Sequence, residues 1–240
     1  MGYPLFLTVK RAPAPEAVPA LREALEKAFP HPENIPYLES LCGSPLPHVT
    51  AQRLGALSLL PALLAEAKID SAPLILRRDG HGRPYCETPD GALPFCGLMG
   101  KPSHFDFNLS PTDAHVAAAL TVGEGKVGVD IEEPIPPARA LPLMRRYCTE
   151  GETAILKDAP DDETVTANFF TSVWVEREAL AKQDGGGMPL RFDTAHIPED
   201  VWMWNGYLPD TDTAVALCAP KDNMPNRPRL TKDSIRFTIQ

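Results

Sequence analysis

VGVDIE (residues 127–132) and WVEREALAK (residues 174–182) are the stretches that decide the fold and the chemistry of this chain. Alternation in the first predicts a strand with its apolar side chains on one face and Asp130 and Glu132 on the other. Helical spacing in the second places Glu178 and Lys182 one turn apart on one flank. Carboxylates this close repel each other unless a cation lies between them. Three of them favour a hard divalent cation, most naturally Mg2+, and the adjacent lysine favours a phosphorylated substrate.

Each of these features also has an ordinary structural interpretation. The strand could be an edge strand with a solvated acidic face, and Glu178 with Lys182 could form a common surface ion pair. Arg177 projects onto the apolar stripe of the helix, so its guanidinium must either reach solvent or find a buried acid. The glycines at residues 185–187 are expected to end the helix.

A weak internal repeat relates the two halves of the chain. Five identities share one offset of 99 residues, and they pair Leu109, Thr112, Asp113, Val116 and Ala117 with Leu208, Thr211, Asp212, Val215 and Ala216. Chance similarity between two Ala/Val-rich hairpins is the alternative explanation. We predict an α+β fold of two similar α/β halves with pseudo-two-fold symmetry, each a helix packed on a small antiparallel sheet. The halves are residues 1–123 and 124–240, and a ligand would lie in the groove between them.

Other elements follow from periodicity and from proline. We expect an edge strand at residues 4–10, helices at residues 15–29 and 49–68, and a hairpin with strands at residues 105–109 and 115–122. Pro61 should kink the second helix. Clusters of prolines, including the one at residues 134–137, indicate connecting segments.

Composition limits the possible partners and the compartment. The 240 residues include 23 Lys and Arg against 32 Asp and Glu, a formal net charge of −9, which argues against nucleic acid as the main partner. The five cysteines form no C-x-x-C pair, which favours a reducing cytoplasm. The N-terminus does not resemble a signal peptide, and the best apolar run, residues 54–67, is too short to span a bilayer. We therefore expect a cytoplasmic protein with no membrane partner.

The set of motifs resembles the 4'-phosphopantetheinyl transferases of the Sfp type, within the holo-acyl-carrier-protein synthase superfamily. GVDIE (residues 128–132) is similar to the family's G-[IV]-D-x-E strand, and residues 174–182 are similar to its W-[ST]-x-K-E-[SA]-x-x-K helix. TEGE (residues 149–152) falls where the family has an s-x-x-E helix start. The resemblance runs from about residue 50 to residue 219 with its motifs in the family's order.

Upstream motifs extend the match into the N-terminal half. GRPY (residues 82–85) resembles the family's G-K-P-Y, and FNLS (residues 107–110) resembles its F-N-[IL]-S-H-S. Arg53 lies in a predicted helix similar to the family's R-x-x-x-G-R segment.

The resemblance implies Mg2+-dependent transfer of the 4'-phosphopantetheine arm of coenzyme A to a serine of an apo acyl or peptidyl carrier protein, with release of 3',5'-ADP. Asp130, Glu132 and Glu178 would bind the metal. Glu178 would also act as the general base, and Lys182 would contact the phosphates during catalysis. The nucleotide part of coenzyme A would be held by the other matching residues, namely Arg53, Arg83, Pro84, Ser110 and Thr112, together with Lys182. A groove between two halves of one chain implies a monomer.

Three positions depart from the family pattern. Pro111 replaces the phosphate-binding histidine of S-H-S, Arg177 replaces the lysine before the glutamate, and Val175 replaces a hydroxyl residue. His104 and His115 are close in sequence, but His115 should lie inside the next strand. One alternative is therefore a catalytically degenerate member that binds coenzyme A or carrier protein without efficient turnover. Another is an unrelated Mg2+-dependent phosphohydrolase, which would leave the upstream motifs unexplained.

Overall fold

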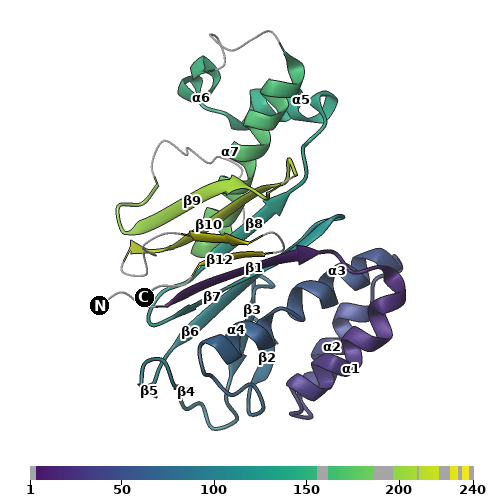
Figure 1. Ribbon diagram of the computed structural model, residues 1–240, viewed down its shortest axis with the longest axis vertical. Helices are drawn as coiled ribbons and strands as arrows, with labels where there is room; N and C mark the ends of the chain where they lie inside the picture. The colour runs from purple at the N-terminus through teal and green to yellow at the C-terminus, as the bar shows by residue number, and fades with distance from the viewer. Residues whose placement is uncertain are drawn as a thin grey trace.

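Two small antiparallel sheets pack against each other and carry helices on their outer faces (Figure 1). The computed structural model describes residues 4–155, 162–185, 197–209 and 211–221, and the backbone of residues 228–231 and 234–237. The apolar layer between the sheets takes alternate residues of strands in both, including Leu7, Ala119, Val129 and Leu217. Because successive side chains of a strand point to opposite faces, the remaining apolar residues face the helices.

The two three-stranded sheets have the same topology. One has the order β1-β7-β6, with β1 at Leu5–Arg11, β6 at Phe105–Pro111 and β7 at His115–Val122. The other has the order β8-β10-β9, with β8 at Gly128–Glu132, β9 at Val201–Tyr207 and β10 at Ala214–Pro220. The hairpins related by the sequence repeat, β6–β7 and β9–β10, thus hold the same places in both sheets. The mixed class of helices and small antiparallel sheets is confirmed, and pseudo-two-fold symmetry stays a prediction.

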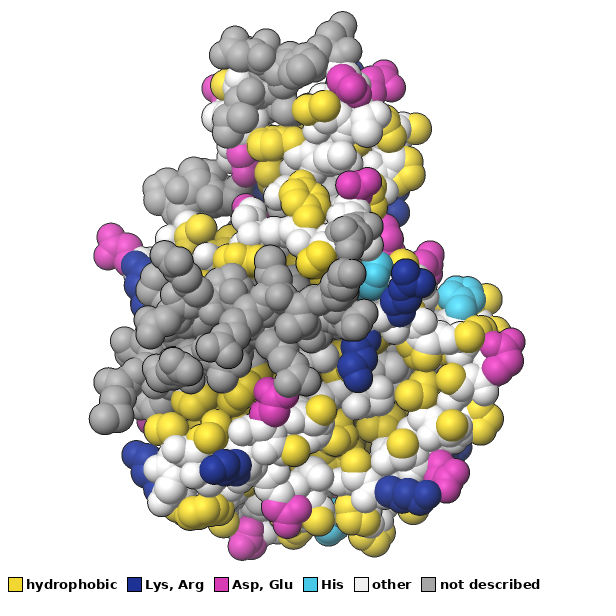
Figure 2. All heavy atoms as spheres, in the orientation of Figure 1, with side chains coloured by type: hydrophobic (Ala, Val, Ile, Leu, Met, Phe, Trp, Pro, Cys, Tyr) yellow, Lys and Arg dark blue, Asp and Glu magenta, His cyan; other side chains and the backbone are white. Residues whose placement is uncertain are grey.

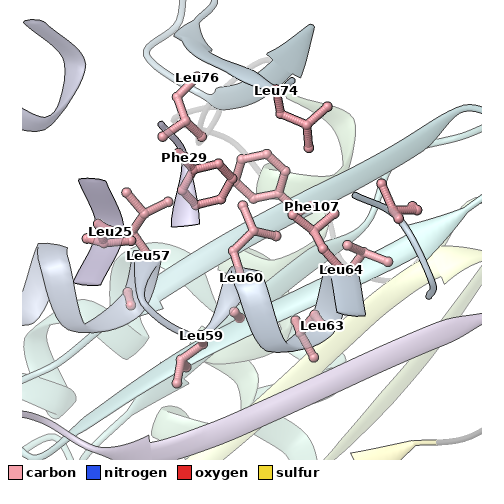
Figure 3. Close-up of a cluster of buried hydrophobic side chains, with 14 of the residues drawn as sticks. Leu25, Phe29, Leu57, Leu59, Leu60, Leu63, Leu64, Leu74, Leu76 and Phe107 are labelled. Carbon is pink, nitrogen blue, oxygen red and sulfur yellow. The ribbon is translucent and has the colours of Figure 1, made fainter. Parts of the chain in front are cut away.

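The first sheet is covered by the N-terminal helices. These are η1 (Pro15–Ala17), α1 (Val18–Ala28), α2 (Asn34–Cys42), α3 (Pro47–Leu57) and α4 (Leu60–Glu66). Figure 3 shows the core beneath them, where Phe29 and Phe107 meet leucines of α3 and α4 such as Leu57, Leu60 and Leu64. All five side chains are at most 1 % exposed, so this layer anchors the N-terminal half.

The second sheet is covered by one long helix, α7 (Glu163–Asp184). Its apolar residues Val175, Ala179 and Leu180 pack on β9 and β10. Two further helices, α5 (Pro137–Tyr147) and α6 (Glu150–Ile155), precede α7, and Ala140 of α5 packs against Phe170 of α7. The cap at Asp162 accepts hydrogen bonds from the first turn of α7, as N-cap aspartates do.

Short hairpins complete the described chain. They are β2 (Ile75–Arg78) with β3 (Pro84–Glu87), β4 (Phe95–Cys96) with β5 (Lys101–Pro102), and β11 (Pro228–Thr231) with β12 (Ser234–Phe237).

Several boundaries differ from the sequence-based expectations. The helix expected at residues 49–68 is two helices, because α3 ends at Leu57 and α4 begins at Leu60, with Pro61 in its first turn. Proline is tolerated there because the first amides of a helix have no partner inside the helix. The same reason explains α5, which begins at Pro137 inside a cluster that we had interpreted as a connector. Helix α2 had not been expected.

A ladder of polar side chains joins the two sheets between β6 and β8. Alternate residues of β6 accept hydrogen bonds from alternate amides along β8. The bonds run from Val127 N to Asp106 Oδ2 (2.7 Å), from Val129 N to Asn108 Oδ1 (3.1 Å) and from Ile131 N to Ser110 Oγ (3.3 Å). Since buried amides need acceptors, this ladder satisfies the free edge of β8 without a backbone partner.

The surface carries charges of both signs. In Figure 2 the Lys and Arg side chains of this face lie among acidic ones and do not form one continuous basic field. Among the residues that the structure describes, no helix has both the length and the apolar character needed to cross a membrane.

Candidate active site

Gly128 lets α7 lie directly on β8. A Cβ atom built at this position would be 1.9 Å from the carbonyl oxygen of Ala179 and 2.6 Å from the amide nitrogen of Gln183. No side chain fits in that space, so glycine here is a requirement of packing. The close approach brings Glu178 and Lys182 of α7 beside the acids of β8.

Asp130 is buried and paired with Lys182. Its side chain is 8 % exposed, and its Oδ1 accepts hydrogen bonds from Lys182 Nζ at 2.6 Å and from Ser110 Oγ at 2.8 Å. Lys182 Nζ also donates to Ser110 Oγ at 3.1 Å and to the carbonyl oxygen of Val129 at 3.3 Å. The acidic face of the strand is therefore not solvated at Asp130. Lys182 forms its ion pair with Asp130 of the strand.

Glu132 and Glu178 lie close enough to Asp130 to feel its charge. Burial raises the pKa of Glu132 to about 7, and the charges of Asp130, Glu133 and Glu178 add to the effect. Burial likewise raises the pKa of Glu178, with a further contribution from Asp130. Mutual repulsion of this kind marks a place where a cation would be stabilised.

The three carboxylates match the chemistry of a magnesium site but are not gathered as one. Within the described ranges, no three His, Cys, Asp or Glu side chains form a ready-made metal site. Asp130 is instead neutralised by the Lys182 ammonium. Carboxylate oxygens are the donors that Mg2+ prefers, and burial together with the neighbouring carboxylates, which raises the pKa values of Glu132 and Glu178, disfavours their charged forms unless a cation is present. The donor set fits the metal, and metal binding stays a prediction.

Arg177 finds a buried acid and does not reach solvent. Its side chain is 1 % exposed, and its Nη2 donates to Glu152 Oε2 at 2.7 Å. Its Nη1 donates to the carbonyl oxygen of Tyr147. Glu152 and Thr149 also cap each other's amides at the start of α6, at 2.7 and 3.2 Å. The T-x-x-E motif therefore pairs α6 with α7, and Arg177 supports the helix without entering the cavity.

A cavity of about 640 Å³ lies where α2, α3, β6 and the end of α7 meet. Five of the predicted site residues line it, namely Arg53, Arg83, Pro84, Glu178 and Lys182. Ser110 and Thr112 do not line it. The hydroxyl of Ser110 donates a hydrogen bond to Asp130, and the hydroxyl of Thr112 donates one to Glu133 Oε1 at 2.6 Å.

The cavity wall also contains residues that the sequence did not suggest. Tyr37 is 9 % exposed, and burial raises its pKa to about 12. The guanidinium carbon of Arg78 lies 5.3 Å from the centre of its ring, within range of a cation–π contact. Arg78 is the last residue of β2, and His81 lies in the turn between β2 and β3. Tyr37 could not have been found, because its helix was not expected.

The histidines near Pro111 lie elsewhere. His115 begins β7, and its Nδ1 lies 3.3 Å from Glu133 Oε1 and 3.4 Å from Thr213 Oγ1. Neither His115 nor His104 lines the cavity, whereas Pro111 and His81 both do.

Comparisons with known proteins agree with this geometry. Residues 126–205 match the family model of the 4'-phosphopantetheinyl transferase superfamily, and this range includes β8 and α7. A protein of Haemophilus influenzae named "Putative 4'-phosphopantetheinyl transferase" is 25 % identical over 184 residues, which cover 74 % of this chain and 69 % of that protein. Both matches make this chain similar to the 4'-phosphopantetheinyl transferase superfamily, and the matched range 126–205 contains Asp130, Glu132, Glu178 and Lys182.

Proposed function

We propose that this protein transfers the 4'-phosphopantetheine arm of coenzyme A to a serine of an apo acyl or peptidyl carrier protein and releases 3',5'-ADP. The similarity to the 4'-phosphopantetheinyl transferase superfamily supports a phosphopantetheinyl transferase. The Sfp subtype, the requirement for Mg2+ and the nature of the carrier belong to the proposal, as do the monomeric state and the pseudo-two-fold relation of the halves.

One observation carries the proposal. Glu178 and Lys182 from the C-terminal half line one cavity together with Arg53 and Arg78 from the N-terminal half. Its volume of about 640 Å³ is within the usual range for sites of large organic ligands. Cations along the wall suit a ligand with several phosphates, and the buried Tyr37 with Leu41 suits its less polar part.

The reaction requires a base beside the pyrophosphate. The serine hydroxyl oxygen of the carrier attacks the phosphorus that bears the pantetheine arm, and the bond from that phosphorus to the bridging oxygen breaks, so 3',5'-ADP leaves. Glu178 would take the serine proton, and two observations support this role: it lines the cavity, and burial raises its pKa above the ordinary value. A base with a raised pKa removes a proton more readily in the transition state.

Asp130, Glu132 and Glu178 would hold the metal, and its charge would offset that of the pyrophosphate and of the leaving group. Lys182 supplies a second positive charge. Lys182 lines the cavity, its ammonium donates a hydrogen bond to Asp130, and its flexible side chain would exchange that carboxylate for a phosphate oxygen of coenzyme A.

A catalytically degenerate member that only binds coenzyme A or carrier protein is the alternative. It is favoured by Pro111, which lines the cavity at the position of the family histidine and offers no donor to a phosphate.

Mass spectrometry of an apo carrier protein incubated with this protein, coenzyme A and Mg2+ tests the proposal. The expected result is the mass gain of one phosphopantetheine, lost in Glu178→Gln, which keeps the shape of the side chain but cannot accept the proton. Bound coenzyme A without a mass gain over several carriers would favour the degenerate alternative. Neither binding nor transfer would contradict both.

A further inference from the structure

Arg83 is held by the protein at the joint between the two halves. Its side chain is 8 % exposed. Its Nη2 donates to Asp106 Oδ2 at 2.5 Å, to the carbonyl oxygen of Val127 at 2.7 Å and to that of Phe107 at 3.4 Å. Its Nη1 donates to the carbonyl oxygen of Lys182. These acceptors belong to β6, to the residue before β8 and to the end of α7, so one guanidinium joins elements of both halves.

The turn before Arg83 fixes where the side chain starts. The carboxylate of Asp79 accepts from the amides of His81 and Arg83, both at 2.9 Å. Gly82 between them has a φ of 83°, a conformation that residues with a Cβ rarely adopt. The backbone is thus set in a tight turn, and the Arg83 side chain leaves it toward the end of α7.

Arg83 contacts α7 at its C-terminal end, where the carbonyl oxygens of a helix need hydrogen-bond donors. The last four carbonyl oxygens of a helix lack intrahelical partners, and a cation near them is favourable. Arg83 donates to one of them, at Lys182, and Lys126 Nζ donates to another, at Asp184, at 3.0 Å. Because the carbonyl belongs to Lys182 itself, Arg83 holds the backbone from which the Lys182 ammonium reaches Asp130.

A second reason keeps Arg83 in place. Asp106 is largely buried, and burial raises the pKa of its carboxyl group while the Arg83 charge lowers it. The same carboxylate accepts from the amide of Val127 in the polar ladder. If Arg83 turned into the cavity to bind an anion, Asp106 would keep its burial without its cation, which is unfavourable.

We propose that Arg83 is a positioning residue: it caps the end of α7 against β8 and thereby places Lys182 and Glu178 beside Asp130, and it does not bind the nucleotide. The kinetic part of this inference rests on the proposed transferase function. The structural part does not, because it concerns only hydrogen bonds between residues of the protein.

Arg83→Met tests the inference, with Arg53→Met as the matched comparison, since Arg53 is exposed on the cavity wall. Arg83→Met should leave the Kd for coenzyme A, measured by titration calorimetry, within about twofold and lower kcat about tenfold or more. Hydrogen exchange should quicken in the last turn of α7 and at Val127. Arg53→Met should instead raise the Kd and leave that exchange unchanged.

Two further variants separate positioning from folding. Arg83→Met combined with Asp106→Asn removes both partners of the buried ion pair, so it should recover the Tm while kcat stays low. Arg83→Lys keeps the charge but lacks the planar fork that reaches Asp106 and the helix carbonyl together, so kcat should also stay low. Recovery of both Tm and kcat in the double variant would show that only charge balance matters and would overturn the inference.

A tenfold rise in the Kd for coenzyme A in Arg83→Met, with unchanged exchange in α7, would make Arg83 a ligand and overturn the inference. Absence of turnover in the unaltered protein contradicts the proposed function alone. In that case the exchange of the last turn of α7 in Arg83→Met and Arg53→Met still decides whether Arg83 positions the helix.

Discussion

Replacing Gly128 by alanine should damage the site although it adds only one methyl group. The new Cβ would lie 1.9 Å from the carbonyl oxygen of Ala179, whereas ordinary contact begins near 3.4 Å. Helix α7 must therefore retreat from β8 by about 1.5 Å. Overpacking of this size destabilises by about 1–3 kcal/mol. A shift of about 1 Å in reacting groups lowers a rate by about 100-fold.

Urea unfolding and the rate of carrier modification measure the two effects of Gly128→Ala. Gly151→Ala is the matched control. It lies exposed in α6, and the nearest atom to its added Cβ is Thr149 Oγ1 at 3.8 Å. Alanine there should be neutral or stabilise by up to about 1 kcal/mol. A Gly128→Ala protein with the unaltered free energy of unfolding and unaltered rate would refute the argument that glycine is needed for α7 to reach β8.

Three other changes have expected outcomes. Arg177→Met should lower the free energy of unfolding by about 3 kcal/mol, because it leaves the Glu152 carboxylate without its buried partner. In EDTA, Glu132→Gln should raise the Tm at pH 8 and lose this advantage toward pH 5. The pKa of Glu132 is about 7 in the folded protein and 4.5 in the unfolded chain. Ionisation of its carboxyl group therefore lowers the free energy of unfolding as the pH rises from 4.5 to 7. Lys182→Met should lower the Tm without metal and increase the Tm gain on adding Mg2+, because Asp130 loses its ammonium partner.

Each of these predictions has a result that would contradict it, and Arg177→Met also has a matched control. Arg146→Met, on the exposed face of α5, should change the free energy of unfolding by less than about 0.5 kcal/mol. If Arg177→Met is equally mild, the buried pair with Glu152 is not supporting the fold. A Tm difference for Glu132→Gln that does not vary with pH would contradict the raised pKa. If Mg2+ raises the Tm of Lys182→Met and of the unaltered protein by the same amount, Asp130 does not bind the metal.

The local signals in the sequence were sufficient for the parts of the fold that depend on neighbours along the chain. Alternation in residues 127–132 gave the strand and its two faces, and helical spacing placed Glu178 and Lys182 on the same side of α7. The repeat correctly matched two hairpins that occupy the same places in two sheets. Proline was the weak signal, because the same residue ends a helix, begins one at Pro137, or lies in a connector.

Only the tertiary structure decided which side chains meet across the halves. Arg83 belongs to a short motif that suggested a ligand contact, yet its partners Asp106, Val127 and Lys182 lie far from it in sequence. Lys182 likewise pairs with Asp130 and not along its own helix with Glu178. Periodicity reports the face on which a residue lies, since that follows from the local backbone. Which distant residues become partners depends on how the two sheets and α7 pack. Burial then makes these pairs necessary, because each buried charged group needs a hydrogen-bonding partner.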